Sequence, residues 1–318
     1  MARPVHTPYD GSATPFTIGL KPFDPRDWIE PGDDLERCLA EKDRLFETVP
    51  DKVFAARGDT TDAQREVLDA LTSHLPERFP GSYRRDGDAM TIGAAGRRVS
   101  LAPDDPAPLK TASLMVAEDL VLMRKCDDGW RLVAASLCFP SSWALAEKYD
   151  RPLQAIHGTV PAFGPGTRTA GLIDRIFDSL KVELPVERMN WSLQENAELF
   201  HPRSKSERDD GAEAQGGFLA GRNPGEVHIR VERQTLRKMP ISGDILFTIR
   251  IHLDPLSVLE SHRDGPKLAR CLENQLAALN ADQLAYKGLA EDRDRLAAWL
   301  RGMAGQDSAS SAERRMNA

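Results

Sequence analysis

The chain has 318 residues, which is enough for one large domain or two small ones with a full hydrophobic core. Charged residues make up 29% of it, the formal net charge is −7, the pI is about 5.6 and no long basic block occurs, so a surface for nucleic acid or for an anionic membrane is not indicated. Because the mean hydropathy is −0.44, no apolar run approaches the roughly 20 residues that cross a bilayer and the first residues lack the apolar core of a signal peptide, we expect a cytoplasmic protein.

The first half of the chain predicts helices followed by hairpins. Residues 1–25, rich in Pro, Thr and Gly, predict an extended arm. Apolar residues at helical spacing predict helices over 33–47 and 61–71, and the first of these has acids in its first turn, as the helix dipole favours. A weak hairpin is expected over 89–101 and a clearer one over 119–139, where Asp-Gly marks the turn.

The second half predicts a hairpin enclosed by helices. A polar, glycine-bearing stretch at 201–222 predicts a flexible insertion, and the residues after 303 predict a disordered tail over 304–318. The other elements expected here are a short helix over 143–150, an amphipathic helix over 169–184, a strand over 188–200, and helices over 266–279 and 291–303.

The most informative stretch is 227–253, which predicts two strands joined by a turn. Val227, Ile229 and Val231 alternate with polar residues, the period of two of a half-buried strand. Arg233 falls on the same face as this apolar row. A buried guanidinium without a partner costs several kcal/mol, so Arg233 needs either an internal carboxylate or an anionic ligand. The order of helices, antiparallel hairpins and helices predicts an α+β fold with a central antiparallel sheet, in a single domain over 26–303.

Sites for several common cofactors are missing from the sequence. The cysteines are scattered without a C-x-x-C pair, so neither an iron–sulfur cluster, a structural zinc nor a disulfide framework is indicated. Cys138 is expected to be a small buried side chain, with a role as a thiolate ligand as the alternative. Neither a Walker A string nor H-E-x-x-H, G-x-S-x-G or a complete G-x-G-x-x-G occurs.

Several strings along the chain carry a family resemblance. They are EDLVLM (118–123), LVAASLCFPSSW (132–143), IHGTVP (156–161), MNWS (189–192), IRVERQTLRKMP (229–240) with ILFTIR (245–250), and YKGL (286–289). In this order, and over roughly residues 20–290, the chain resembles the haem-dependent oxidative N-demethylase α-subunit-like family.

The resemblance implies a haem b bound in a PAS-like domain that works as an oxygenase. By this resemblance the protein would use O₂ to hydroxylate a carbon next to the nitrogen of a small amine and release formaldehyde. Because the chain carries no nicotinamide or flavin motif, a separate NAD(P)H-linked reductase would supply the electrons. The alternative is a haem or small-ligand sensor or scaffold without catalytic activity on the same fold, since a fold does not establish a reaction.

An axial haem ligand must be a side chain held beside an apolar cleft, and a neutral imidazole suits it. His157, within IHGTVP, is the first candidate; its alternative role is to cap a helix or bind a backbone carbonyl. His201, beside the insertion, is the second candidate. The remaining histidines are assigned to the surface, to cross-strand pairs or to no role: His6, His74, His228, His252 and His262.

The acidic propionates of haem need donors, and the fork of arginine suits them. Within the ERQTL string, Arg230 and Arg233 are the candidates, with solvated charges or an internal ion pair as the alternative. Glu232 is assigned either to orienting an arginine or to holding a substrate ammonium, with a cross-strand ion pair as the ordinary alternative.

Aromatic faces attract alkylammonium groups, so tryptophans in the family strings are candidates as well. We assign Trp143 to the side of the cofactor, and Trp191 with Asn190 to the catalytic pocket. For each tryptophan the alternative is an ordinary core residue. Asn190 would offer a hydrogen bond to bound oxygen.

Overall fold

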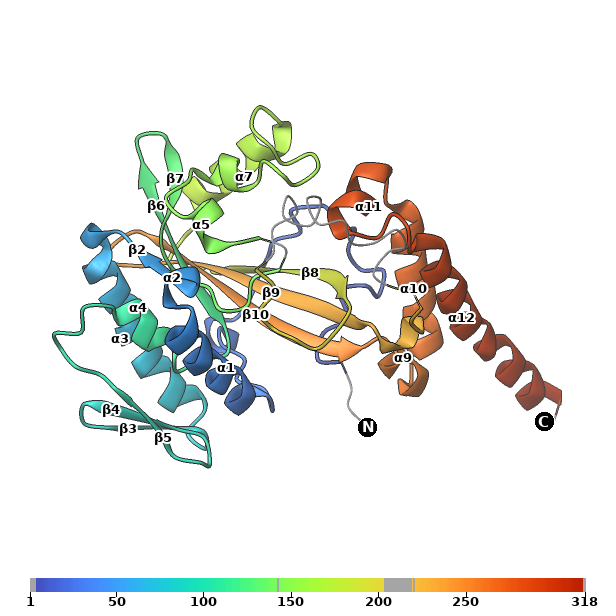
Figure 1. Cartoon of the computed structure of the whole chain (residues 1–318), viewed down its shortest axis with the longest axis horizontal. Coiled ribbons are helices and arrows are strands. Elements are labelled where there is room, and N and C mark those ends of the chain that lie inside the picture. The colour runs from blue at the N-terminus through green and yellow to red at the C-terminus, as the bar shows by residue number, and fades with distance from the viewer. Residues whose placement is uncertain (1–3, 142, 203–218, 220, 317–318) are drawn as a thin grey trace.

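The centre of the protein is a seven-stranded antiparallel sheet, seen edge-on in Figure 1. The computed structural model describes residues 4–141, 143–202, 219 and 221–316, and side chains only up to residue 305. In spatial order the strands of the large sheet are β1 (Lys21–Pro22), β8 (Val186–Gln194), β9 (His228–Lys238), β10 (Ile245–Pro255), β6 (Asp119–Cys126), β7 (Gly129–Ser136) and β2 (Phe54–Ala56). A small second sheet consists of β3 (Tyr83–Asp86), β4 (Ala89–Ile92) and β5 (Arg97–Ser100).

Helices cover both faces of the large sheet and one of its ends. Figure 1 shows α1, α3 and α4 on one side of the sheet, α5 and α7 on the other, and α9 to α12 beyond the ends of β9 and β10. Their bounds are α1 Leu35–Thr48, α2 Pro50–Val53, α3 Thr61–Arg78, α4 Pro108–Ser113, α5 Leu145–Lys148, α6 Leu153–Ile156, α7 Arg168–Ser179, α9 Val258–Ser261, α10 Gly265–Ala278, α11 Ala281–Lys287 and α12 Arg293–Met316. Within the described residues, no helix is both long enough and apolar enough to cross a membrane.

The α+β prediction is confirmed, while the PAS-like description stays a prediction. The hairpins expected over 119–139 and 227–253 are β6–β7 and β9–β10. The last helix is longer than expected, because α12 continues to Met316 through most of the segment predicted as a disordered tail. The predicted flexible insertion lies mainly outside the described residues, since 203–218 and 220 are not among them.

The register of the central strands sorts their side chains onto two faces. Residues that pair across antiparallel strands lie on the same face, and Glu232 pairs with Asn190 of β8 and with Ile251 of β10. The apolar row of β10 therefore shares a face with the polar row of β9. The apolar row of β9 lies on the opposite face, where it packs in a cluster with residues of α10 and α12.

The N-terminal arm packs against the rest of the chain. Tyr9 is fully buried, and the Gln275 side chain on α10 donates a hydrogen bond to the Ala13 carbonyl at 2.9 Å. Further along, Phe16, Ile18 and Leu20 approach the large sheet. The arm thus links the helical end of the molecule to the sheet.

Candidate functional site

A cavity of about 1370 Å³ lies over the face of the sheet that carries Asn190 and Glu232. Its floor is formed mainly by even-numbered residues of β8 and β9 and odd-numbered residues of β10. Its walls come from the N-terminal arm, the segment 137–177 and α11. Small-molecule pockets typically have volumes of about 300–1,000 Å³. This cavity exceeds that range, so it has room for a large cofactor and a small substrate together.

The strings that carry the family resemblance converge on this cavity. They are far apart in the sequence, yet each contributes residues to the lining. Examples, one from each string, are Val121, Phe139, His157, Asn190, Glu232, Phe247 and Tyr286. The strings that carry the resemblance therefore line one and the same cavity.

His157 lines the cavity at the C-terminal end of α6. Its ring packs edge-on against Phe163, with ring centroids 6.2 Å apart. Among the described residues, its ring nitrogens form no hydrogen bond. Burial, and then the charges of Lys148 and Arg188, lowers the pKa of His157 to about 4. The imidazole is therefore neutral at physiological pH, which is the form that binds a metal.

This low pKa predicts an acid sensitivity that can be assigned to one residue. An unfolded histidine has its ordinary pKa of 6.5. Between pH 6.5 and about 4 the unfolded chain therefore binds a proton at this position, whereas folded His157 does not. The free energy of unfolding should fall over this window, by up to about 3 kcal/mol at ~1.4 kcal/mol per pH unit. We expect His157→Gln to lose this part of the pH dependence in urea unfolding of the haem-free chain. Parallel pH profiles for the two proteins would contradict the assignment.

Arg188, on β8, is a cation that the sequence analysis did not single out. It lines the cavity, and its Nε atom is buried without a hydrogen-bond partner in the described part of the chain. Burial lowers the pKa of Arg188, against the nearby Glu232 and Tyr286. No ion pair of Arg188 is found among the described residues. A buried donor left unpaired costs about 1–3 kcal/mol or more, so this guanidinium is suited to an anionic ligand.

Lys148 is a second cation in the cavity wall, also missed in the sequence. Its Nζ lies 4.1 Å from the centroid of the Trp143 ring, and both side chains line the cavity. Burial lowers the pKa of Lys148 to about 8, against the nearby Glu232 and Glu147. Trp143 thus lines the cavity, but Lys148 already lies over one face of its ring.

Glu232 and Asn190 face the cavity as directly paired residues of neighbouring strands. Arg230 is fully buried beneath this surface and does not line the cavity. It donates from Nη2 to the Phe139 carbonyl at 2.6 Å, and its Nε lies 3.3 Å from Glu232 Oε1. The assignment of Arg230 to a haem propionate is therefore wrong, because its side chain is used to hold Glu232 and the chain around Phe139.

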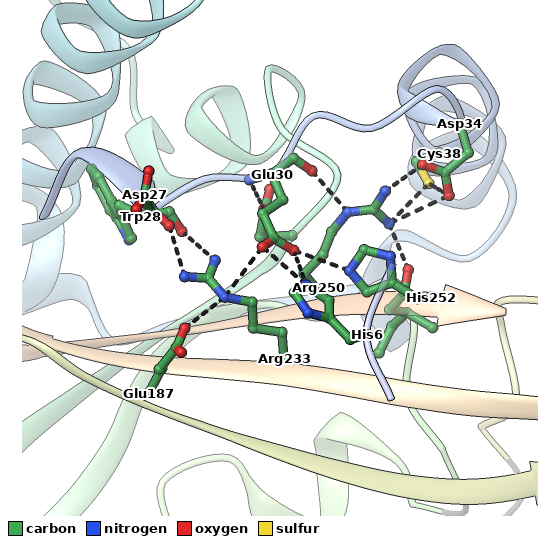
Figure 2. Close-up of polar contacts among 12 residues, drawn as sticks. His6, Asp27, Trp28, Glu30, Asp34, Cys38, Glu187, Arg233, Arg250 and His252 are labelled. Carbon is green, nitrogen blue, oxygen red and sulfur yellow. Dashed lines mark hydrogen bonds and ion pairs between the residues drawn. The ribbon is translucent and has the colours of Figure 1, made fainter. Parts of the chain in front are cut away.

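The assignment of Arg233 to a propionate is also wrong. The register places Arg233 on the face opposite the cavity, where Figure 2 shows it between Glu187 and Glu30. There its Nε donates to Glu187 Oε2 at 2.8 Å and lies 3.4 Å from Glu30 Oε1. The other guanidinium nitrogens donate to the carbonyls of Trp28 and Asp27. The internal ion pair, which the sequence left as the alternative, is the one observed.

Trp191 is a core residue and does not contribute to the pocket. It lies on the same face as Arg233 and is 3% exposed. Its Nε1 donates to Gln275 Oε1 at 2.6 Å, and Lys287 Nζ lies 4.4 Å from its ring centroid. The neighbouring Asn190 points to the opposite face because side chains alternate along a strand.

The second histidine candidate, His201, also lines the cavity. It differs from His157 in that its Nε2 lies 3.3 Å from Gln194 Nε2. Tyr286, from the YKGL string, is a further lining residue that sequence reasoning passed over. Burial and then Glu232 raise the pKa of Tyr286 to about 12, so it stays a neutral phenol.

These residues fit a haem. The cavity offers room, a neutral histidine whose ring nitrogens have no protein partner in the described part of the chain, and a guanidinium with an unpaired buried nitrogen. His157 would hold the iron, and Arg188 with Lys148 would face the propionates.

Comparison with known protein families agrees with this geometry. The model of the family described as "Haem-dependent oxidative N-demethylase, alpha subunit-like" matches residues 19–297, which include every cavity-lining residue named above except Phe16 and Ile18 of the arm. The chain belongs to the haem-dependent oxidative N-demethylase, alpha subunit-like family.

Proposed function

We propose that the protein is a haem b monooxygenase that removes a methyl group from an amine. The overall change would be R₂N–CH₃ + O₂ + 2e⁻ + 2H⁺ → R₂NH + HCHO + H₂O. The observation that carries this proposal is the placement of His157, neutral and without a hydrogen bond to the described residues, in the wall of a cavity large enough for both haem and substrate. Family membership supports the same cofactor and reaction class.

We assign a separate role to each group of residues that lines the cavity. His157 would hold the iron through a ring nitrogen, while Arg188 and Lys148 would neutralise the propionates. When bound, haem would supply the O₂ activation that oxidation of a C–H bond requires. The apolar lining, including Phe247, Ile249 and Leu236, would exclude bulk water from the reacting groups.

Glu232 and Asn190 are the residues we assign to the substrate. Gln234 Nε2 donates to Glu232 Oε2 at 3.0 Å, and Arg230 fixes the other oxygen, so the carboxylate is held in one orientation. A fixed carboxylate can accept a hydrogen bond from an amine N–H or hold its positive charge. Asn190 beside it can donate a hydrogen bond from its amide into the cavity.

The electrons would come from another protein. The sequence carries no nicotinamide or flavin motif, and the words "alpha subunit-like" in the family description support a partner subunit. We propose a separate NAD(P)H-linked reductase as the donor and the cytoplasm as the location.

Turnover with a surrogate reductase tests the proposal. The full chain should show a Soret band after reconstitution with haem, and then consume O₂ and release formaldehyde in equal amounts when a methylated amine is supplied. Reconstituted protein without amine is the control for uncoupled O₂ reduction. A Soret band without formaldehyde from any of a panel of methylated amines would overturn the enzyme and favour a haem sensor. Absence of a Soret band would overturn the cofactor.

Replacing Arg188 provides a separate test of its proposed role in binding haem. Arg188→Leu should weaken haem binding about 10- to 100-fold, because a hydrogen bond to a charged group is worth about 1.5–3 kcal/mol. Arg188→Lys should restore part of the loss by restoring the charge. The matched control is Arg222→Leu, since Arg222 also lines the cavity but is paired with Glu195 at 3.1 Å. Haem titration followed at the Soret band measures all three. Equal losses in Arg188→Leu and Arg222→Leu would remove Arg188 from this role.

A further inference from the structure

A second group of possible ligands lies on the opposite face of the sheet from the cavity. His6 of the N-terminal arm, Glu30 of the loop before α1 and His252 of β10 converge there, as Figure 2 shows. Their nearest ligand atoms all lie within 4.8 Å of one another. From the sequence, no role was expected for His6, and His252 was expected at the surface or in a cross-strand pair. His252 is in fact 8% exposed and bonded to Glu30.

The two separations from the imidazoles to Glu30 suit a metal ion as well as hydrogen bonds. His6 Nε2 lies 2.9 Å from Glu30 Oε2, and His252 Nε2 lies 3.1 Å from the same oxygen. For metal–ligand bonds of about 2.1 Å, two ligands at right angles are about 3.0 Å apart. Two histidines and one carboxylate that leave coordination positions open are a known ligand set for iron(II) and, with water, for zinc.

The surrounding charges leave the carboxylate of Glu30 for such an ion. Arg233 has its shorter ion pair with Glu187, at 2.8 Å against 3.4 Å to Glu30. Arg250 is bonded to Asp34 and donates to the Glu30 main-chain carbonyl, not to its side chain. Each arginine thus has a carboxylate closer to it than that of Glu30, whose Oε2 contacts both imidazoles.

The backbone holds Glu30 in place before any ligand binds. Its amide donates to Glu118 Oε1 at 2.8 Å, and its carbonyl accepts from Arg250 Nε at 2.9 Å. His252 is fixed by the β9–β10 ladder, opposite Val231. Preorganised ligands lower the ordering cost of binding.

A small cavity of about 360 Å³ adjoins the group and gives access to it. His6 and Glu30 line it, together with Arg233 and Glu187. An ion bound here could keep a water or a small anion on the side of the cavity. Such an open position distinguishes the arrangement from a closed structural zinc site.

We propose that His6, Glu30 and His252 form a binding site for a divalent transition-metal ion, of the zinc and iron(II) class, that is separate from the haem cavity. The ion would fasten the N-terminal arm to β10. The same arm contributes Phe16, Ile18 and Leu20 to the haem cavity, so the ion would also fix part of that wall.

Metal titration of the full chain tests this proposal. After treatment with a chelator, the protein is titrated with Zn²⁺ by calorimetry and with Co²⁺ by visible absorption, with and without added haem. We expect one ion per chain in both cases, and a rise in melting temperature with Zn²⁺. Because haem would occupy His157, binding that persists in the haem-loaded protein cannot arise from that residue.

Glutamine variants separate a metal site from a hydrogen-bonded cluster. Glutamine can still donate a hydrogen bond to Glu30 but is a poor ligand for these ions. His6→Gln and His252→Gln should each weaken Zn²⁺ binding by more than the roughly 10–100-fold that loss of an outer-shell partner costs. The matched control, His262→Gln, should bind as the unmodified chain does. Stoichiometric Zn²⁺ binding that survives in both variants, or no binding in the unmodified chain, overturns the proposal.

Discussion

Replacing His157 with alanine should deprive the protein of most of its bound haem. Among the described residues the ring of His157 makes no hydrogen bond, so its loss leaves no broken network behind, and the low pKa keeps it neutral for iron. Removing this imidazole would take away the only bond we propose between protein and iron. The measurement is the ratio of Soret to protein absorbance in the purified variant and after haem titration.

Two comparisons distinguish this ligand from its rival. His201→Ala should keep its haem, because His201 is held by contact with Gln194. In His157→Gly, added imidazole should enter the vacated space and restore the Soret band. Purification of His157→Ala with full haem content and an unchanged spectrum would remove His157 from the site. Loss of haem in His201→Ala would instead transfer the role to His201.

Replacing Arg233 with leucine should reduce the free energy of unfolding by about 3–5 kcal/mol. The reason is the charge left behind: Glu187, 7% exposed, would lose its closest cation, and the carbonyls of Asp27 and Trp28 would lose their donors. Urea or guanidinium unfolding of the haem-free variant measures this. Haem affinity in the variant that remains folded should change little, because Arg233 lies on the other face of the sheet.

Arg188→Leu is the matched variant on the cavity face of the same strand pair. It removes a guanidinium whose Nε has no partner in the described residues, so it should cost little stability while weakening haem binding. The two arginine variants should therefore show opposite patterns. An Arg233 variant with unchanged stability and lost haem would reverse our placement of both residues.

Much of the fold could be predicted from local sequence signals. Asp128-Gly129 identified the β6–β7 hairpin, and the alternation around Ile229 identified β9, because turn chemistry and side-chain period act over a few residues. His157, Asn190, Glu232 and Trp143 line the cavity, and their roles there stay predictions.

The errors came from interactions between distant segments. Alternation places Arg233 with Val231, but only the register with β8 and β10 reveals which face covers the cavity. Glu187 and Glu30 lie far from Arg233 in sequence, so its ion pairs could not be read locally. Trp191 was misplaced for the same reason, since its partner Gln275 comes from α10.

Arg188 could have been found from one available signal. It stands two residues before Asn190 in the same predicted strand, so both side chains must share a face. Lys148 and Tyr286 offered less, because their approach to Glu232 depends on how α5 and α11 pack. The tertiary packing partners of a short helix cannot be predicted from the sequence of that helix alone.

One face of β8 and β9 borders the cavity and the other packs in the buried interior, which has a practical consequence for altering substrate choice. Positions 190, 192 and 234 border the cavity, whereas their immediate neighbours 191, 233 and 235 are tied into the buried interior. Randomising the first set should yield many folded variants with changed ligand preference, and randomising the second should yield few folded ones. Alternate residues of these strands can thus be altered almost independently of one another.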